Sequence, residues 1–365
     1  MIPRENPDLI GHDEAERALL VAWNSGRMPH AWLIGGISGI GKATLAFRFA
    51  RFALARGGHR QMGGQGGGLD MFGAPPSPPA SLYLSPDDPV FRRVRAGGHA
   101  DLLTVERRYD DKRGKMKTEI AVDDVREVSA FMRRTSGEDG WRVVIIDGVE
   151  QMNASGHNAL LKILEEPPEQ ALLLLVSETP GGLLPTIRSR CRKLPLNPLP
   201  EEAVTGWLAM HKPDIASADR AALARLSEGS IGRALGLATA GGLDLYRQMI
   251  ALLATLPRLD LKAAHAFADA VTRKGEDAAW DTATGLLVWW LARLVKALAE
   301  GRRPVEIGSG EGALLARLAA AQPGLDRWLE VWEKAAQLFA RADAANLDRK
   351  QVMLNALLGI EAALA

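Results

Sequence analysis

Cysteine is almost absent from this sequence, since one residue of 365, Cys191, is a cysteine. A lone cysteine cannot form an internal disulfide, and no group of Cys and His residues has the spacing of a zinc site. A disulfide-stabilised secreted scaffold and a zinc-binding module are therefore excluded as interpretations. The scarcity of cysteine fits a reducing compartment, so we expect a cytoplasmic protein without a metal-ligand cluster.

A dominant charge of one sign is also missing. The 45 basic and 44 acidic residues leave a formal net charge of +1. The hydrophobic share of 47% is that of a soluble globular protein. A wholly basic nucleic-acid-binding chain is therefore not expected, although local basic patches stay open.

Long hydrophobic runs are lacking as well. The first twenty residues contain no apolar stretch like that of a signal peptide, and we expect none to be present. The most apolar helical pattern, Leu286 to Leu298, is interrupted by Arg293 and Lys296 and is too short to cross a bilayer. We expect this segment to be a buried core helix.

Short apolar runs alternate with helical patterns over residues 1–195, which is typical of a parallel sheet covered by helices on both faces. The runs VVIID and ALLLLV are continuously apolar, as central strands buried on both faces require. We predict helices at about 43–56, 123–134 and 154–166, the second with Asp123 as its N-cap. The predicted strands are Ala31–Gly35, Asp101–Val105, Arg142–Asp147, Ala171–Ser177 and a short strand near Arg192–Leu196.

Composition divides the remainder of the chain. Residues 57–80 contain twelve Gly or Pro in 24 positions, which predicts a flexible loop within the first domain. After Pro200 the pattern is helical throughout, and we expect a linker at Gly241-Gly242. We therefore predict an α/β domain at 1–198, a small helical domain at 199–242 and an all-α domain at 243–365.

A glycine-rich loop, Gly36-Ile37-Ser38-Gly39-Ile40-Gly41-Lys42, lies between the first predicted strand and a predicted helix. In this context a G-x-x-x-x-G-K match indicates a phosphate-binding loop. Glycines let backbone N–H groups wrap a phosphate, the helix N-terminus adds positive potential, and Lys42 supplies a point charge. We predict a nucleotide site here, with Gly36, Gly39, Gly41 and Lys42 as its phosphate-binding residues; the alternative is a plain glycine-rich turn.

The position that binds Mg²⁺ in P-loop ATPases is altered. Ala43 stands where a Ser or Thr hydroxyl is expected. Thr44 belongs to the degenerate site, but one residue along a helix turns a side chain by about 100°, so it is no simple replacement. A magnesium ion has therefore lost one protein ligand.

The base that activates water is altered too. Asp147 ends a predicted strand, where the Walker B aspartate holds the metal, but Gly148 replaces the glutamate that should follow. Loss of a positioned base costs on the order of 10²- to 10⁴-fold in rate. Glu150 is the alternative base. We expect no hydrolysis by this chain alone, whereas binding of ATP or ADP stays open.

Three further segments are long and specific. SGRMPHAWLIGG leads into the phosphate loop, HNALLKILEEPP occupies residues 157–168, and Thr186-Ile187-Arg188-Ser189-Arg190-Cys191 precedes the last predicted strand. In their order and spacing they resemble the clamp-loader branch of AAA+ ATPases. Together with GHADLLTVER, ANLDRKQVMLNALL and the two altered positions, they are most similar to the delta prime subunits of bacterial DNA polymerase III. The resemblance is weakest in the C-terminal domain.

The resemblance implies an AAA+ P-loop domain, a helical lid and a helical collar for the three predicted domains. In this family the arginine of the Ser-Arg-Cys motif reaches the ATP of a neighbouring subunit, which assigns that role to Arg190, flanked by Ser189 and Cys191. A guanidinium suits this task because it stays charged and can span two phosphate oxygens. The alternative for Arg190 is an ion pair that fixes the strand end. Cys191 is expected to be a small buried residue and no nucleophile.

The resemblance also implies partners: gamma/tau and delta subunits in a hetero-pentamer, the sliding clamp, and primer-template DNA within the complex. The chain would help load the clamp as part of the DNA polymerase III holoenzyme, with no cofactor required. It departs from the family pattern by lacking a four-cysteine zinc module and by having Gly232 where motor subunits carry the sensor 2 arginine. Arg233 is displaced by one position, and Ser177 lies near the sensor 1 position without assigned chemistry.

Two other functions compete with this interpretation. One is a gamma-type motor subunit that hydrolyses ATP itself, against which Ala43 and Gly148 argue. The other is an unrelated P-loop enzyme such as a small-molecule kinase, against which the Ser-Arg-Cys motif and the helical C-terminal half argue.

Overall fold

The computed structural model describes residues 2–57, 78–110, 115–137, 140–273, 275, 277–301, 305–308, 310–321 and 324–364. The chain divides into two units, Met1–Ala203 and Val204–Ala365. The boundary between these units lies five residues after the predicted end of the α/β domain. The further predicted division at 242/243 stays a prediction. Most of the predicted loop 57–80, from 58 to 77, lies outside the described residues.

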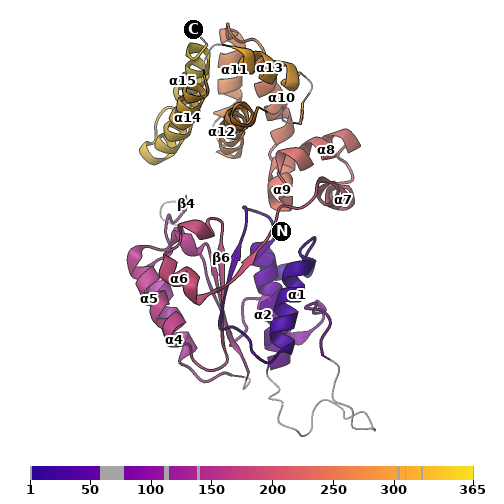
Figure 1. Ribbon diagram of the computed structural model, residues 1–365, viewed down its shortest axis with the longest axis vertical. Coiled ribbons are helices and arrows are strands. Elements are labelled where there is room, and N and C mark those ends of the chain that lie inside the picture. Colours follow the sequence, from indigo (N-terminus) through magenta and orange to yellow (C-terminus); the bar gives the residue numbers. More distant parts are fainter. Residues whose placement is uncertain are drawn as a thin grey trace. The chain divides into compact units, whose positions relative to one another are not determined.

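A five-stranded parallel sheet forms the centre of the first unit (Figure 1). All five predicted strands are confirmed, three of them with the predicted bounds. Strands β5 and β6 lie at the inside of the sheet and consist of the continuous apolar runs that predicted their burial on both faces. In spatial order the strands are β2 (Leu102–Val105), β5 (Arg142–Asp147), β6 (Ala171–Ser177), β1 (Ala31–Gly35) and β7 (Arg192–Pro195).

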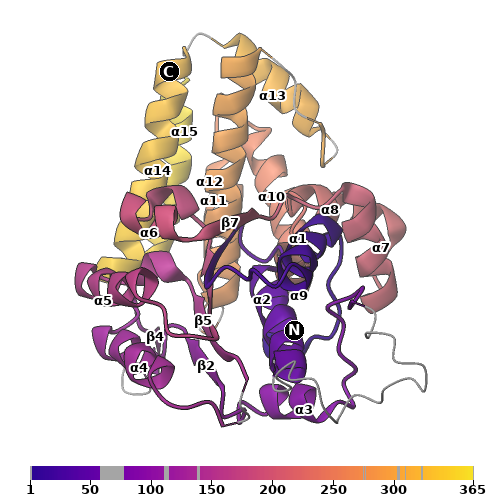
Figure 2. The same ribbon diagram turned by 60° about the horizontal axis from the view of Figure 1, so that its bottom comes forward.

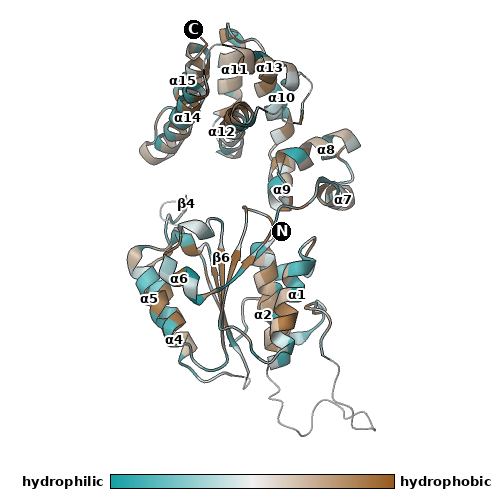
Figure 3. Ribbon diagram, viewed as in Figure 1, coloured by the Kyte–Doolittle hydropathy of each residue, from teal (hydrophilic) through white to brown (hydrophobic). Residues whose placement is uncertain are grey.

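Side chains alternate between the two faces of this sheet. On β5, Val143 and Ile145 belong to one hydrophobic core, and Val144 and Ile146 belong to the other. Figure 3 shows the central strands in brown, the apolar end of its scale. The first core is closed by α1 (Asp13–Asn24), α2 (Lys42–Gly57) and α3 (Pro89–Arg95); the second by α4 (Val122–Met132), α5 (Ala154–Glu165) and α6 (Pro185–Arg190).

The start of α4 differs from the prediction. The helix begins at Val122 with Ala121 as its N-cap, so Asp123 lies in the first turn and is not the cap. There it faces the positive end of the helix dipole, where a carboxylate is also favourable. A short antiparallel pair of strands, β3 (Tyr109–Asp110) and β4 (Lys115–Met116), precedes this helix. With two residues each, these strands are too short to be recognised in the sequence from alternating apolar and polar residues.

Among the described residues, the second unit contains helices and their connections but no strands, as predicted. In the first unit, helices α4 and α5 lie beside each other in both views (Figure 2). The second unit is built of the helices that follow. These are α7 (Glu201–His211, which spans the division), α8 (Ser217–Leu226), α9 (Ile231–Thr239), α10 (Gly242–Leu253), α11 (Leu261–Val271), α12 (Asp277–Glu300), α13 (Glu311–Ala320), α14 (Leu325–Ala345) and α15 (Arg349–Ala362).

Helix α12 is longer than the predicted segment 286–298. Its 24 residues are enough, by length and composition, to cross a membrane. One flank is nevertheless buried among the other helices, with Trp280, Leu287, Trp290 and Leu291 hardly exposed, as expected for a core helix. At its far end Arg293 pairs at 2.7 Å with Glu311, which is fully buried.

Helices α9 and α10 are separated by two residues only. Gly241 adopts a left-handed conformation with φ 63° at the N-cap of α10. The predicted linker Gly241-Gly242 is therefore a tight turn between two helices.

Candidate functional site

The predicted phosphate loop connects β1 to α2. Gly41 has φ 112°, in the region that favours glycine, and a Cβ there would lie 3.4 Å from Leu9 and 3.6 Å from His12. Gly36 and Gly39 also have positive φ. The loop thus has the backbone that the glycine pattern predicted, and its N–H groups lead into the N-terminus of α2, where a phosphate is favoured.

Lys42 is the first residue of α2 and is nearly buried, at 6% exposure. Its Nζ donates a hydrogen bond to the carbonyl of Ile37 at 2.7 Å and lies 3.9 Å from Oε1 of Glu178. Burial lowers the pKa of Lys42, while the carboxylates of Glu178, Asp147 and Glu150 act in the opposite direction. A phosphate would therefore compete with contacts that the lysine already makes inside the protein.

An N-terminal segment packs against the same loop. Nε2 of His12 is 2.8 Å from the carbonyl of Ile40, in a buried contact. Arg51 of α2 donates to the carbonyls of Asn6 and Arg4 at 2.7 and 3.0 Å and fixes the segment further along. No motif in the sequence pointed to these residues. Each of them contacts the backbone of a segment that lies far from it in the sequence.

Asp147 ends β5, as predicted, and Gly148 follows it in a left-handed conformation with φ 81°. A Cβ on Gly148 would lie 2.6 Å from the side-chain oxygen of Gln151. The replacement of glutamate is therefore more than a missing side chain, since the left-handed backbone favours glycine and the end of the Gln151 side chain would have to move to admit another residue at 148.

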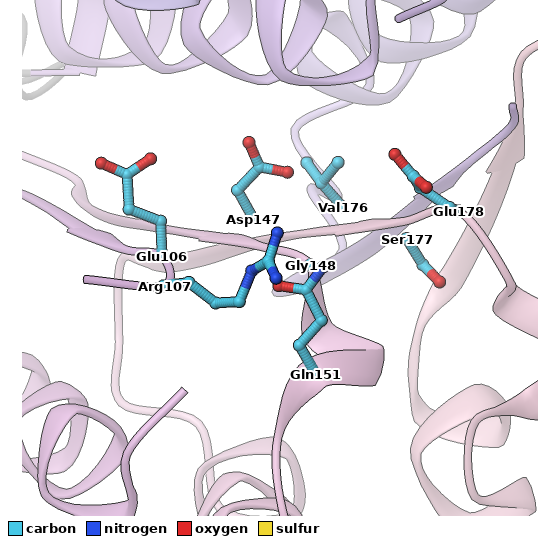
Figure 4. A pocket seen from close by; sticks show the side chains of 8 residues that line it. All are labelled: Glu106, Arg107, Asp147, Gly148, Gln151, Val176, Ser177 and Glu178. Carbon is cyan, nitrogen blue, oxygen red and sulfur yellow. The ribbon is translucent and has the colours of Figure 1, made fainter. Parts of the chain in front are cut away.

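An acidic cavity of about 210 Å³ lies at the carboxyl ends of β2, β5 and β6. Figure 4 shows the carboxylates of Glu106 and Asp147 on the same side of the strand ends, with Gln151 below Gly148. Glu106 and Glu178 each follow a strand directly, a position that could have marked them as site residues from the sequence. The lining residues are Glu106, Arg107, Asp147, Gly148, Gln151, Val176, Ser177 and Glu178.

Glu150, the alternative base, has one oxygen engaged in a hydrogen bond, while its Oε2 is buried without a hydrogen-bond partner among the described residues. Its Oε1 accepts a hydrogen bond from the backbone N–H of Glu178 at 2.8 Å, which ties the 3₁₀ turn Val149–Gln151 to the end of β6. Ala43 and Thr44 lie in the first turn of α2. The glycine loop and Lys42 suit a phosphate, but of the expected metal ligands only the carboxylate of Asp147 is in place, and the described residues contain no cluster of three metal-binding side chains.

The raised pKa of the Asp147 carboxyl predicts that the folding stability of the protein depends on pH. Burial, and next the nearby Glu106, raise its pKa from 3.8 to about 6. Between these values the folded state keeps a proton that the unfolded state loses, so stability falls as pH rises from 4 to 6. We expect Asp147→Asn to stabilise the protein by about 1 to 2 kcal/mol above pH 6 and to have no effect below pH 4.

Urea unfolding of both proteins at pH 4 and pH 7.5 measures this difference. Asp123→Asn is the matched control, because Asp123 is an exposed carboxylate that pairs with Arg126 on the surface. Equal stability of the wild type and Asp147→Asn at pH 7.5 would contradict the effect of burial.

The Ser-Arg-Cys motif forms the end of α6. Arg190 is 35% exposed and donates to Oε1 of Glu165 at 2.7 Å and to the carbonyl of Thr186 at 3.0 Å. Ser189 donates to the same carbonyl at 3.1 Å. Cys191 is buried, and burial raises the pKa of its thiol to about 12, so it has the expected inert character.

The remaining sequence candidates have local partners. Arg188 lines a second cavity, of about 480 Å³, with Gly36 and Lys193. Ser177 is fully buried and accepts from the N–H of Thr179 at 3.2 Å. Within the second unit, Arg233 pairs with Glu228 at 2.9 Å and its guanidinium lies 5.4 Å from the Trp289 ring, which joins α9 to α12. These contacts, and the one-residue displacement, leave a sensor role for Arg233 without support.

Comparison with known proteins shows similarity to DNA polymerase III subunits. Residues 87–200 match the family described as DNA polymerase III, delta subunit. The chain is 34% identical over 202 residues to DNA polymerase III subunit delta′ of Pseudomonas aeruginosa, covering 55% of this chain and 53% of the relative. It is 32% identical over 221 residues to subunit delta′ of Escherichia coli, covering 60% and 57%.

A more distant relative is the gamma/tau subunit of Mycobacterium bovis, 28% identical over 207 residues that cover 57% of this chain and 31% of that protein. The chain spans about half the length of the delta′ relatives it matches.

Proposed function

We propose that this chain, an AAA+ protein related to the delta prime subunits of bacterial DNA polymerase III, helps to load the sliding clamp onto primed DNA. In this proposal it occupies one position of a clamp-loader complex and supplies Arg190 to the ATP site of the neighbouring subunit. Its own site takes no part in hydrolysis. The chain would work in the cytoplasm, with gamma/tau and delta subunits as partners.

The observation that carries the proposal is the contrast between the two sites. At the chain's own loop, Gly148 lacks the catalytic carboxylate and has a left-handed backbone that disfavours a glutamate in its place, and Ala43 has no hydroxyl for a metal. At the end of α6, Arg190 is partly exposed with both terminal nitrogens held in place. An arginine provided in trans stabilises charge on a transferring phosphoryl group.

The chain's own nucleotide site is assigned a structural role in this proposal. Lys42 and the glycine loop can hold the phosphates of ATP or ADP, provided that the ligand displaces the Ile37 carbonyl and Glu178 from the lysine. No turnover follows from such binding. A gamma/tau-type motor function would need a catalytic base, and Glu150, whose Oε1 is bonded to the Glu178 backbone, keeps only Oε2 for that role.

Assembly tests the proposal directly. Mixed with gamma/tau and delta subunits, the chain is expected to enter one complex on gel filtration and to raise the ATPase that depends on clamp and primed DNA. A mixture from which the chain is omitted is the control. Failure to co-elute with either subunit, in a mixture where those subunits bind each other, would refute the assignment.

A further inference from the structure

Two motifs singled out in the sequence, HNALLKILEEPP and Ser189-Arg190-Cys191, meet at one ion pair. Glu165 is the last residue of α5 and Arg190 is the last residue of α6, and they lie 2.7 Å apart between Oε1 and a terminal guanidinium nitrogen. The other terminal nitrogen of Arg190 donates to the Thr186 carbonyl at 3.0 Å. The side chain of the predicted finger is thus fixed at both ends of its guanidinium fork.

We propose that Glu165 is a positioning residue for Arg190, which holds the guanidinium ready for the neighbouring subunit's nucleotide. This inference rests on the proposed function. A free arginine side chain loses much rotamer freedom when it binds, and a side chain that is already oriented loses less. A guanidinium has five N–H donors, so two contacts leave further donors for phosphate oxygens.

The exposure of the Glu165–Arg190 pair indicates that Glu165 orients Arg190 and does not keep it from a phosphate. Glu165 is 50% exposed and Arg190 is 35% exposed, and ion pairs in such surroundings are weak. Hydrogen bonds from a guanidinium to phosphate are charge-assisted and can be bidentate. Glu165 can therefore orient Arg190 without withholding it from a triphosphate.

The neighbouring carboxylate provides a matched control. Glu166 is exposed at the C-cap of α5, whereas Arg190 contacts Glu165 and Thr186. Glu166→Gln removes one negative charge from the same place without touching the Arg190 contact. Glu165→Gln removes the charge but keeps an oxygen that can accept the hydrogen bond, and Glu165→Ala removes both.

The test uses the reconstituted complex of full-length subunits with clamp and primed DNA. We expect Glu165→Ala to lower the kcat of the neighbouring subunit's site roughly three- to tenfold with little change in KM, because orientation of the finger matters in the transition state. The total ATPase of the complex should then lose most of the share that Arg190→Ala removes. Glu165→Gln should fall between this variant and the wild type, and Glu166→Gln should match the wild type. Glu165→Ala combined with Arg190→Ala should be no slower than Arg190→Ala alone.

Each result decides one question. An unchanged or raised kcat in Glu165→Ala would overturn the inference, as would additive effects in the double variant. If Glu165→Ala does not assemble on gel filtration, Glu165→Gln takes its place, and wild-type kcat in that variant would overturn the inference. If Arg190→Ala itself has no effect, the proposed function of the finger fails, which is a separate outcome.

Discussion

Replacing Arg190 with alanine is expected to slow ATP hydrolysis at the neighbouring site of the assembled complex by about 10³-fold. The reason is electrostatic: a guanidinium in trans neutralises charge that develops on the transferring phosphoryl group, and alanine offers none. The total ATPase should then fall to what the other sites supply. Phosphate release in the presence of clamp and primed DNA measures the change.

Arg192 offers a matched control for this variant. It lies two residues further on, in β7, and is exposed, so Arg192→Ala removes the same charge from the same surface. We expect it to leave the ATPase close to the wild-type rate. Arg190→Lys should recover little activity, because an ammonium cannot make the bidentate contact. Equal rates for Arg190→Ala and the wild type would remove Arg190 from the role of finger.

The second large effect concerns the isolated chain, whose ATP turnover is expected to be about 10²- to 10⁴-fold below that of an AAA+ subunit with an intact base. Restoring the expected residues one at a time should not repair it. Gly148→Glu introduces a Cβ at φ 81° against the Gln151 side chain, and we expect it to destabilise the protein by about 1 to 3 kcal/mol.

Two further variants separate strain from chemistry. Gly148→Ala carries the same backbone penalty without a carboxylate, and its urea midpoint should fall by a similar amount. Ala43→Thr, Gly148→Glu and Gln151→Ala combined restore a metal hydroxyl, a base and the space for it, and any gain in phosphate release should appear only in this triple variant. Robust magnesium-dependent turnover by the unmodified chain would contradict the assignment of an inactive site.

Periodicity was enough to predict the sheet. Strands β1, β5 and β6 have the predicted bounds because their apolar runs end at Gly, Asp and Ser, where the chain leaves the core. The N-cap of α4 was predicted wrongly, since Asp123 and Asp124 follow Ala121 and more than one acidic residue competes for the same helix start. The extent of α12 was underestimated because its first turns contain Asp277 and Asp281 and lack a continuous apolar run.

The site was predictable in part. Spacing identified Lys42 and Asp147, since a motif between a strand and a helix fixes where they lie. It could not give the contact of Lys42 with Glu178 or the position of Gln151 under Gly148, because these depend on how separate strand ends meet in space. The partner of Arg190 was likewise not predicted, although Glu165 lies in a motif that the sequence had singled out. The role of Arg190 itself stays a prediction.

The arrangement at Gly148 also bears on how the protein can evolve. A single mutation to glutamate would produce a crowded, strained turn, and a single change at Gln151 would remove a side chain that lines the acidic cavity without adding a base. Each of these single changes alone leaves the turn either strained or without a base. If the proposed function holds, recovery of an independent ATPase would therefore require coordinated changes at positions 43 and 148, the second of them at a cost in backbone strain.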